Sequence, residues 1–221
     1  MFSRSIIYAI VLGAPAYAWS DIKLDLFLGE SKIGTGTYSE SFDHHGRKTS
    51  VTKLWGKNVK GVKMTITQIK EIDKDGYPIH EEETVIEGTG KQADERNYNV
   101  KYDSTGAAIL ILVTNKRATT ERSFVPPPGL SRADASDLWF SKTKPLSGTS
   151  IRSTVFDIEN MSWQIVETTF VGKRWVTASG RSVEANLIVD IRDGVKREVY
   201  LDDKGLPVLM KTGPHRVEKH F

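Results

Sequence analysis

The sequence predicts an all-β protein, mainly antiparallel, that forms an open barrel or two packed sheets. Apolar and polar residues alternate with a period of two through much of the chain, which is typical of strands with one buried face. Short turns containing an acidic residue and a glycine separate these segments and are suited to joining antiparallel strands. Because the 221 residues include no cysteine, disulfides cannot stabilise this fold and a hydrophobic core is expected to do so.

The first residues have the pattern of a secretory signal peptide. Arg4 supplies one positive charge, residues 6–12 are apolar, and residues 16–18 form the small-x-small pattern that signal peptidase accepts. We therefore expect cleavage after Ala18 and export to the periplasm or to the outside of the cell. A spanning helix needs about 20 apolar residues, and no segment of the chain approaches that length, so we expect no integral membrane segment after cleavage.

Alternation and turn residues define the strands of the first half. Residues 22–28 place Ile and Leu at every second position. Residues 107–113 are apolar on both faces, which predicts a central strand or one covered on both sides. Further strands are predicted at residues 33–42, 48–55, 62–67, 78–87 and 98–102.

Proline residues divide the chain near its middle. Residues 125–129, Val-Pro-Pro-Pro-Gly, cannot continue a strand or a helix. Ser131 follows as a helix N-cap, with Asp134 three residues later, so we expect one short helix over residues 131–140. We expect residues 19–221 to form a single domain in which the two halves share one core, because each alone would bury too little apolar surface.

The second half has the clearest strand pattern. Apolar residues occupy every second position from Val183 to Ile191. Residues 198–211 are expected to form a strand, a tight turn and a strand, in which Asp202 and Gly205 shape the turn. The basic residues 213–221 are expected to fray. The remaining predicted strands are residues 150–156, 163–171, 174–178 and 195–201.

Charge and motifs exclude several classes of function. The 31 Lys and Arg residues nearly balance the 28 Asp and Glu residues and are scattered, so no nucleic-acid partner is predicted. No nucleophile elbow, phosphate-binding loop or zinc-protease motif is present. We therefore nominate no catalytic residue and predict no cofactor, although an enzyme is not excluded.

Two segments superficially resemble metal sites. Residues 71–82 have some of the spacing of a calcium loop, but Glu71 replaces the expected first Asp and Pro78 occupies the position of the usual hydrophobic residue. His44 and His45 are adjacent and belong to a turn, which exposes both rather than making them converge. We interpret both segments as hairpin turns and predict no metal site.

Large aromatic residues are the remaining signal. Trp139 and Phe140 on the predicted helix, together with Trp163 and Trp175, are the candidate lining of a ligand cavity under that helix. Two alternatives stay open for the aromatic residues: packing in the core, or an exposed platform that stacks on sugar rings.

Two segments of the last third resemble those of exported bacterial β proteins of unknown function. They are residues 171–185, a strand, a glycine turn and an alternating strand, and residues 200–208 with their acidic-glycine turn. Together they resemble the half-barrel of the periplasmic lipoprotein-carrier superfamily. This resemblance implies an antiparallel sheet wrapped around a short helical segment, a cavity that accepts lipid, and no catalytic residues.

The leading hypothesis is an exported, non-catalytic binding protein for an apolar or amphipathic envelope ligand. The alternative is a structural or protein-interaction module of the cell envelope, which would use an apolar patch or an unpaired edge strand. A secreted hydrolase or carbohydrate-active protein is the third hypothesis and would require a cleft with paired carboxylates. The sequence does not indicate an oligomeric state.

Overall fold

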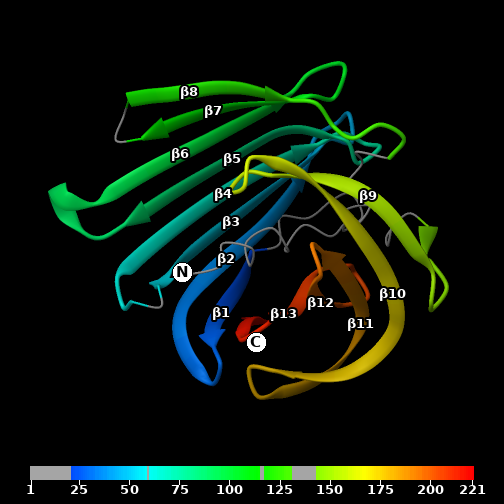
Figure 1. Ribbon diagram of the computed structural model, residues 1–221. Coiled ribbons are helices and arrows are strands. Elements are labelled where there is room, and N and C mark those ends of the chain that lie inside the picture. Colours follow the sequence, from blue (N-terminus) through cyan, green and yellow to red (C-terminus); the bar gives the residue numbers. More distant parts are fainter. Residues whose placement is uncertain (1–20, 59, 115–116, 131–142) are drawn as a thin grey trace.

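A single antiparallel sheet of fourteen strands makes up nearly all of the structure (Figure 1). The computed structural model describes residues 21–58, 60–114, 117–130 and 143–221, so the predicted signal peptide and helix lie outside the described residues. The predicted all-β, antiparallel class is confirmed. The elements are β1 (Ile22–Leu28), β2 (Ser31–Phe42), β3 (Lys48–Lys57), β4 (Lys63–Ile72), β5 (Pro78–Glu87), the 3-10 helix η2 (Gly90–Gln92), β6 (Asp94–Tyr102), β7 (Ala108–Thr114), β8 (Arg117–Phe124), β9 (Ser150–Asp157), β10 (Ser162–Ala178), β11 (Arg181–Arg192), β12 (Val195–Leu201), β13 (Pro207–Thr212) and β14 (His215–Lys219).

The strand order joins two meanders through the first and last strands. The order is β8-β7-β6-β5-β4-β3-β2-β1-β14-β13-β12-β11-β10-β9, so β1 pairs with β14 and every other neighbour is consecutive in the chain. The expectation that residues 213–221 fray is wrong, because β14 is bonded on both sides. The ladder leaves β8 and β9 as edges, so the sheet is not closed into a barrel.

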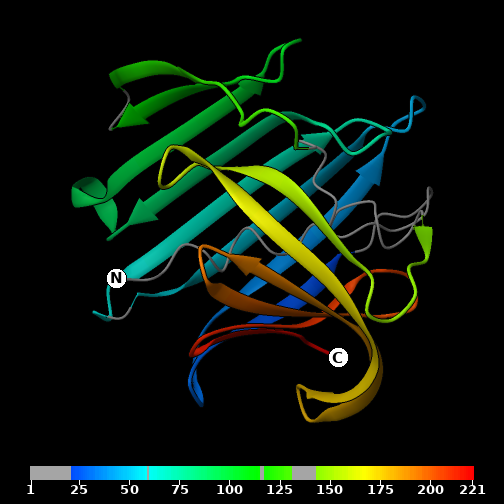
Figure 2. The same cartoon turned by 45° about the vertical axis from the view of Figure 1, so that its right-hand side comes forward.

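The sheet curls until its two ends pack against each other through side chains. Figures 1 and 2 both show β9 and β10 lying over the β3–β6 part of the sheet. The Trp163 indole N–H donates to the carbonyl of Phe124 on β8 at 2.9 Å. Side-chain packing therefore brings the two ends of the sheet together, although no backbone hydrogen bonds join the edge strands β8 and β9 in the described strand order. The buried residues of this contact are Tyr98, Val100, Ala108, Leu110, Phe156 and Ile158.

The main core lies inside the curl and draws on both meanders. It includes Leu24 and Tyr38 from the first meander and Ile188 and Met210 from the second. Inward residues alternate with outward ones along each strand, as the pleat requires. The core can therefore form only when β1 and β14 hold the meanders together.

A second curl buries the opposite face of the last strands. The 17-residue strand β10 has a register shift between Phe170 and Gly172, where Gly172 has φ +113°, and its distal half bends over β12 and β13 (Figure 1). The neighbours Leu187 and Ile188 consequently lie in two different apolar clusters. The middle of β11, residues 185–188, is thus buried on both faces.

One turn motif recurs at the hairpins. At Asp202, Oδ1 accepts the backbone N–H groups of Lys204 and Leu206, each at 2.9 Å, and Gly205 has φ +81°. The same side-chain bonds and a positive-φ glycine occur in the turns that begin at Asp43, Asn58, Asp73 and Asp103. The hairpin interpretation of residues 71–82 is confirmed, because Asp73 uses its carboxylate oxygen to hold the turn.

Gly205→Ala tests the backbone requirement of this turn. An alanine at positive φ is strained, so we expect the variant to lose about 1–2 kcal/mol of unfolding free energy. The measurement is equilibrium urea unfolding, with Lys204→Ala in the same turn as the control that stays within about 0.5 kcal/mol of wild type. Equal losses in the two variants would contradict the motif's role.

Tyr200 in the second curl predicts a pH dependence of stability. Burial, together with the bond that its hydroxyl donates to Glu198 Oε2 at 3.0 Å, raises the pKa of Tyr200 to about 12. The unfolded chain has a tyrosine pKa of about 10. The stability that Tyr200 contributes is therefore complete below about pH 10 and is lost as the pH rises through about 12.

Tyr200→Phe should remove both the late-titrating phenol from the ultraviolet absorbance curve and this fall in stability. The check is alkaline titration at equilibrium, with urea unfolding at several pH values. If the variant instead lacks a phenol that titrates near the usual pKa of about 10, the pKa of Tyr200 is not raised in the folded protein.

Candidate ligand-binding site

A polar cavity of about 190 Å³ lies where β10, β11, β12 and β13 adjoin the turns at their ends. The ladder sets Asp190 opposite Arg197, and Arg197 opposite Thr212, so residues distant in sequence meet on one row. This volume suits a small polar group or a few water molecules. The lining consists of Asp157, Asn160, Gln164, Asp190, Arg192, Asp193, Val195, Arg197 and Thr212.

A buried ion pair forms the floor of the cavity. The Asp190 carboxylate is buried and accepts a bond from the Thr168 hydroxyl at 2.8 Å through Oδ1. Its Oδ2 accepts from Arg197 Nε at 3.1 Å and also from Nη2. Bonds at both oxygens hold the carboxylate and the guanidinium in fixed positions.

Asp157 is the second buried carboxylate of the lining. Its Oδ1 accepts the backbone N–H of Asn160 at 2.9 Å, and its Oδ2 accepts the Asn160 side-chain amide at 3.1 Å. The carboxylate is therefore also held in place, by the turn between β9 and β10.

Two residues of the lining each hold a buried polar atom without a hydrogen-bond partner in the described part of the chain. The atoms are Gln164 Oε1 on β10 and Thr212 Oγ1 on β13, in residues that are 7% and 8% exposed. Buried polar atoms in folded proteins are nearly always satisfied by protein or by bound molecules. The lining thus combines fixed charges with two residues whose hydrogen-bonding capacity is unused.

A buried polar band crosses the concave face on β2–β5. Glu40 lies opposite Ser50, Ser50 opposite Lys70, and Lys70 opposite Glu81, and all four are buried. The next row consists of Tyr38, Thr52, Gln68 and Glu83. Polar side chains here replace the apolar ones that a lipid cavity would require.

An ion pair excluded from water lies at one side of the band. Lys48 Nζ lies 2.8 Å from Glu40 Oε1, with both side chains 1% exposed, and the Tyr38 hydroxyl donates to the same oxygen. A pair of this kind gains little net stability, but removing one partner leaves an isolated buried charge.

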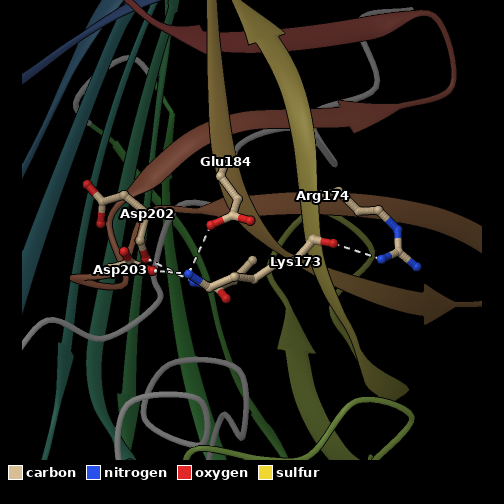
Figure 3. A network of polar contacts seen from close by, with 6 residues as sticks. Lys173, Arg174, Glu184, Asp202 and Asp203 are labelled. Atoms are coloured by element: carbon tan, nitrogen blue, oxygen red, sulfur yellow. Dashed lines mark hydrogen bonds and ion pairs between the residues drawn. The ribbon is translucent and has the colours of Figure 1, made fainter.

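A second charged group lies on the surface of the second curl (Figure 3). Lys173 Nζ is 3.1 Å from Glu184 and 3.2 Å from Asp203, and these two carboxylates raise the pKa of Lys173. All three side chains are about half exposed or more, so solvent screens their attraction. The group links β10 and β11 to the β12–β13 turn, which begins at Asp202. Because its members are exposed, it forms no enclosed site.

The aromatic residues expected to line a cavity have different locations. Trp139 and Phe140 lie outside the described residues. Trp163 packs against Phe156 and Tyr102, with ring centres 5.6 and 6.1 Å apart. Trp175 is 72% exposed on the distal half of β10. Trp163 and Trp175 therefore do not meet, and neither lines the polar cavity.

The sequence held one signal for the polar lining. Thr212 follows Val208 and Met210 in an otherwise apolar, inward-facing row of β13. Asp190 gives no such signal, because its row on β11 also contains Asn186 and Arg192. The register and curl of the sheet decide which polar residues face a buried surface. Neither can be predicted from the local sequence.

Among the residues that the structure describes, neither a cluster of metal ligands nor a membrane-spanning helix is present. No group of three or more His, Asp or Glu side chains is placed to hold a metal ion there. Within the same residues, no helix has the length and apolar character needed to cross a bilayer.

Lys48→Met tests the buried ion pair. The variant leaves the Glu40 charge without its cation, so we expect a loss of about 3–5 kcal/mol in unfolding free energy. Glu40→Gln/Lys48→Met removes both charges and should recover a large part of that loss. Urea unfolding of the wild type and both variants checks this, and a double variant less stable than the single one would contradict it.

Comparison with known proteins shows the fold alone. No protein-family model matches the chain, and no curated protein is significantly similar to it. A crystal structure of a beta-barrel-like protein of the domain of unknown function DUF1849, from Brucella abortus, aligns with a TM-score of 0.55 at 14% identity, over 95% of this chain and 96% of that one. A DUF1089 family protein from Pseudomonas aeruginosa aligns with a TM-score of 0.42 at 13% identity, over 88% of this chain and 95% of that one. The chain therefore has the fold of the beta-barrel-like DUF1849 protein.

Proposed function

We propose that the protein is an exported, non-catalytic binding protein for an amphipathic envelope ligand whose polar end occupies the cavity between β10 and β13. One observation carries the proposal: Gln164 and Thr212, which line the cavity beside the fixed Asp190–Arg197 pair, each hold a buried polar atom that has no partner among the described residues. Leaving such atoms unsatisfied costs about 1–3 kcal/mol each. A ligand that hydrogen-bonds to them recovers that cost.

An exposed apolar side chain at the cavity supports the amphipathic character of the ligand. Val195 lines the cavity and is exposed. It pairs with Arg192, which also lines the cavity, so the two side chains lie on the same face of the sheet. An apolar ligand segment could cover Val195 while the polar end of the ligand enters the cavity.

The bonding of the cavity carboxylates supports a binding role by fixing their orientation. Both oxygens of Asp157 and of Asp190 accept hydrogen bonds from neighbouring groups. Carboxylates held in this way position charge and fix the shape of the cavity.

The open edges of the sheet support a second candidate, a protein-interaction module. Among the strands that the structure describes, β8 and β9 each have a neighbour on one side only. An unpaired edge can accept a strand from a partner protein. This candidate predicts binding that variants of the cavity do not alter.

Gln164→Leu and Thr212→Val test the proposed binding site. Protein purified from its own host should carry a non-covalent ligand in native mass spectrometry, and lipid extraction should remove it. Because each variant removes one ligand hydrogen bond, we expect about tenfold weaker retention. Thr177→Val, at an exposed position of the same β10 strand, is the matched control.

Unfolding of the extracted variants separates binding from folding. Replacing an unpartnered buried polar group by an apolar one should leave the stability of the ligand-free protein unchanged or raise it. Variants that fold normally and retain the ligand as the wild type does would contradict the proposed site.

A further inference from the structure

The outer face of the β3–β4 hairpin carries an exposed tryptophan among lysines. Alternation along β3 directs Trp55 outward, between Lys53 and Lys57 on the same strand face. Lys63 on β4 lies opposite Lys57. Trp55 is 43% exposed, and the three lysines are exposed around it.

The hairpin turn extends this surface. Lys60 and Val62 are both exposed in the turn that Asn58 caps. We call the six residues at this end of the hairpin the Trp55 face, and they are Lys53, Trp55, Lys57, Lys60, Val62 and Lys63. Two apolar side chains are thus surrounded by four cationic ones.

The charge of the Trp55 face is not neutralised within the described part of the chain. None of its four lysines forms an ion pair with a carboxylate described in the structure. On the next strands, Arg96 engages the carboxylates of Glu87 and Asp94 at 2.9 and 3.2 Å. Four positive charges on one hairpin exceed the formal +3 of the whole chain.

The backbone holds this face in a fixed shape. Trp55 lies between Thr35 on β2 and Thr65 on β4, so β3 is bonded on both sides. The small threonines leave the indole standing above its neighbours. A preformed backbone loses less conformational entropy on binding than a loop that must become ordered.

We infer that the Trp55 face docks the protein on an anionic phospholipid membrane. An indole ring has an apolar body and a polar N–H, which suits it to the boundary between headgroups and acyl chains. Each lysine near an anionic bilayer strengthens attraction by about fivefold at physiological salt. The aromatic and cationic groups of the Trp55 face match these two features of the membrane surface.

Trp175 provides a matched comparison within the same molecule. It is more exposed than Trp55, but it lies opposite Glu184, and the neighbouring Lys173 is paired with Glu184 and Asp203. Exposure of an indole alone would make Trp175 the better membrane contact. The charge around Trp55 is what distinguishes the two sites.

The test is sedimentation of the full mature chain with phospholipid vesicles. Vesicles contain phosphatidylcholine, either alone or with a quarter of phosphatidylglycerol, and binding is measured at low and at high salt. We expect binding to the anionic vesicles only, and weaker binding at high salt. Lys53→Gln/Lys57→Gln/Lys63→Gln should reduce partitioning roughly 100-fold, with folding checked by urea unfolding.

Quenching by brominated phosphatidylcholine in the anionic vesicles identifies the tryptophan that enters the membrane. Trp55→Phe should abolish most of the quenching, and Trp175→Phe should leave it unchanged. The inference is overturned if the triple-lysine variant binds like wild type or if Trp175→Phe removes the quenching. It is also overturned if the protein binds a soluble sulfated polysaccharide but no vesicle.

Discussion

The pairing of β1 with β14 is the constraint on which the rest of the structure depends. It joins the ends of the described chain through five register pairs, from Leu24 with Lys219 to Leu28 with His215. Around this seam, Asp25 Oδ1 lies 2.6 Å from Lys32 Nζ, and Asp25 Oδ2 lies 3.0 Å from His220 Nδ1. Burial alone would raise the pKa of Asp25, but these two partners together hold it below its usual value. Without the seam, each meander would expose the apolar face that now forms half of the main core.

The seam and the two curls together explain why so many polar residues are buried. A sheet that bends one way around the main core and the other way over β12 and β13 buries one face of most strands, and both faces of the middle of β11. Polar side chains at inward positions then pair with one another, as Glu40 does with Lys48 and Asp190 with Arg197. Where the pairing is incomplete, at Gln164 and Thr212, the polar cavity remains. The proposed binding site is thus a consequence of the topology.

The hairpin turns were predictable from sequence because their determinants are local. Asp103 and Gly106 shape one turn whatever the rest of the chain does. Long-range register was not predictable: the alternation from Val183 to Ile191 gave the correct strand, but Leu187 and Ile188 both face apolar clusters. The tail that becomes β14 has a strand only because β1 and β13 flank it. For the same reason, Gln164 and Thr212 could not be identified as neighbours. The predicted site consisted of aromatic residues instead, because their large apolar side chains can be recognised without knowing the register.

The cavity and the Trp55 face suggest one division of labour, in which the protein holds an amphipathic molecule at one site and contacts an anionic bilayer at another. The proposed ligand site is tested most directly by a high-resolution crystal structure of the protein purified from its own host without lipid extraction. We expect non-protein density in the cavity, within hydrogen-bonding distance of Gln164 and Thr212, that continues over Val195. Ordered water alone in the cavity, at full occupancy and bonded to both side chains, would contradict the proposed site.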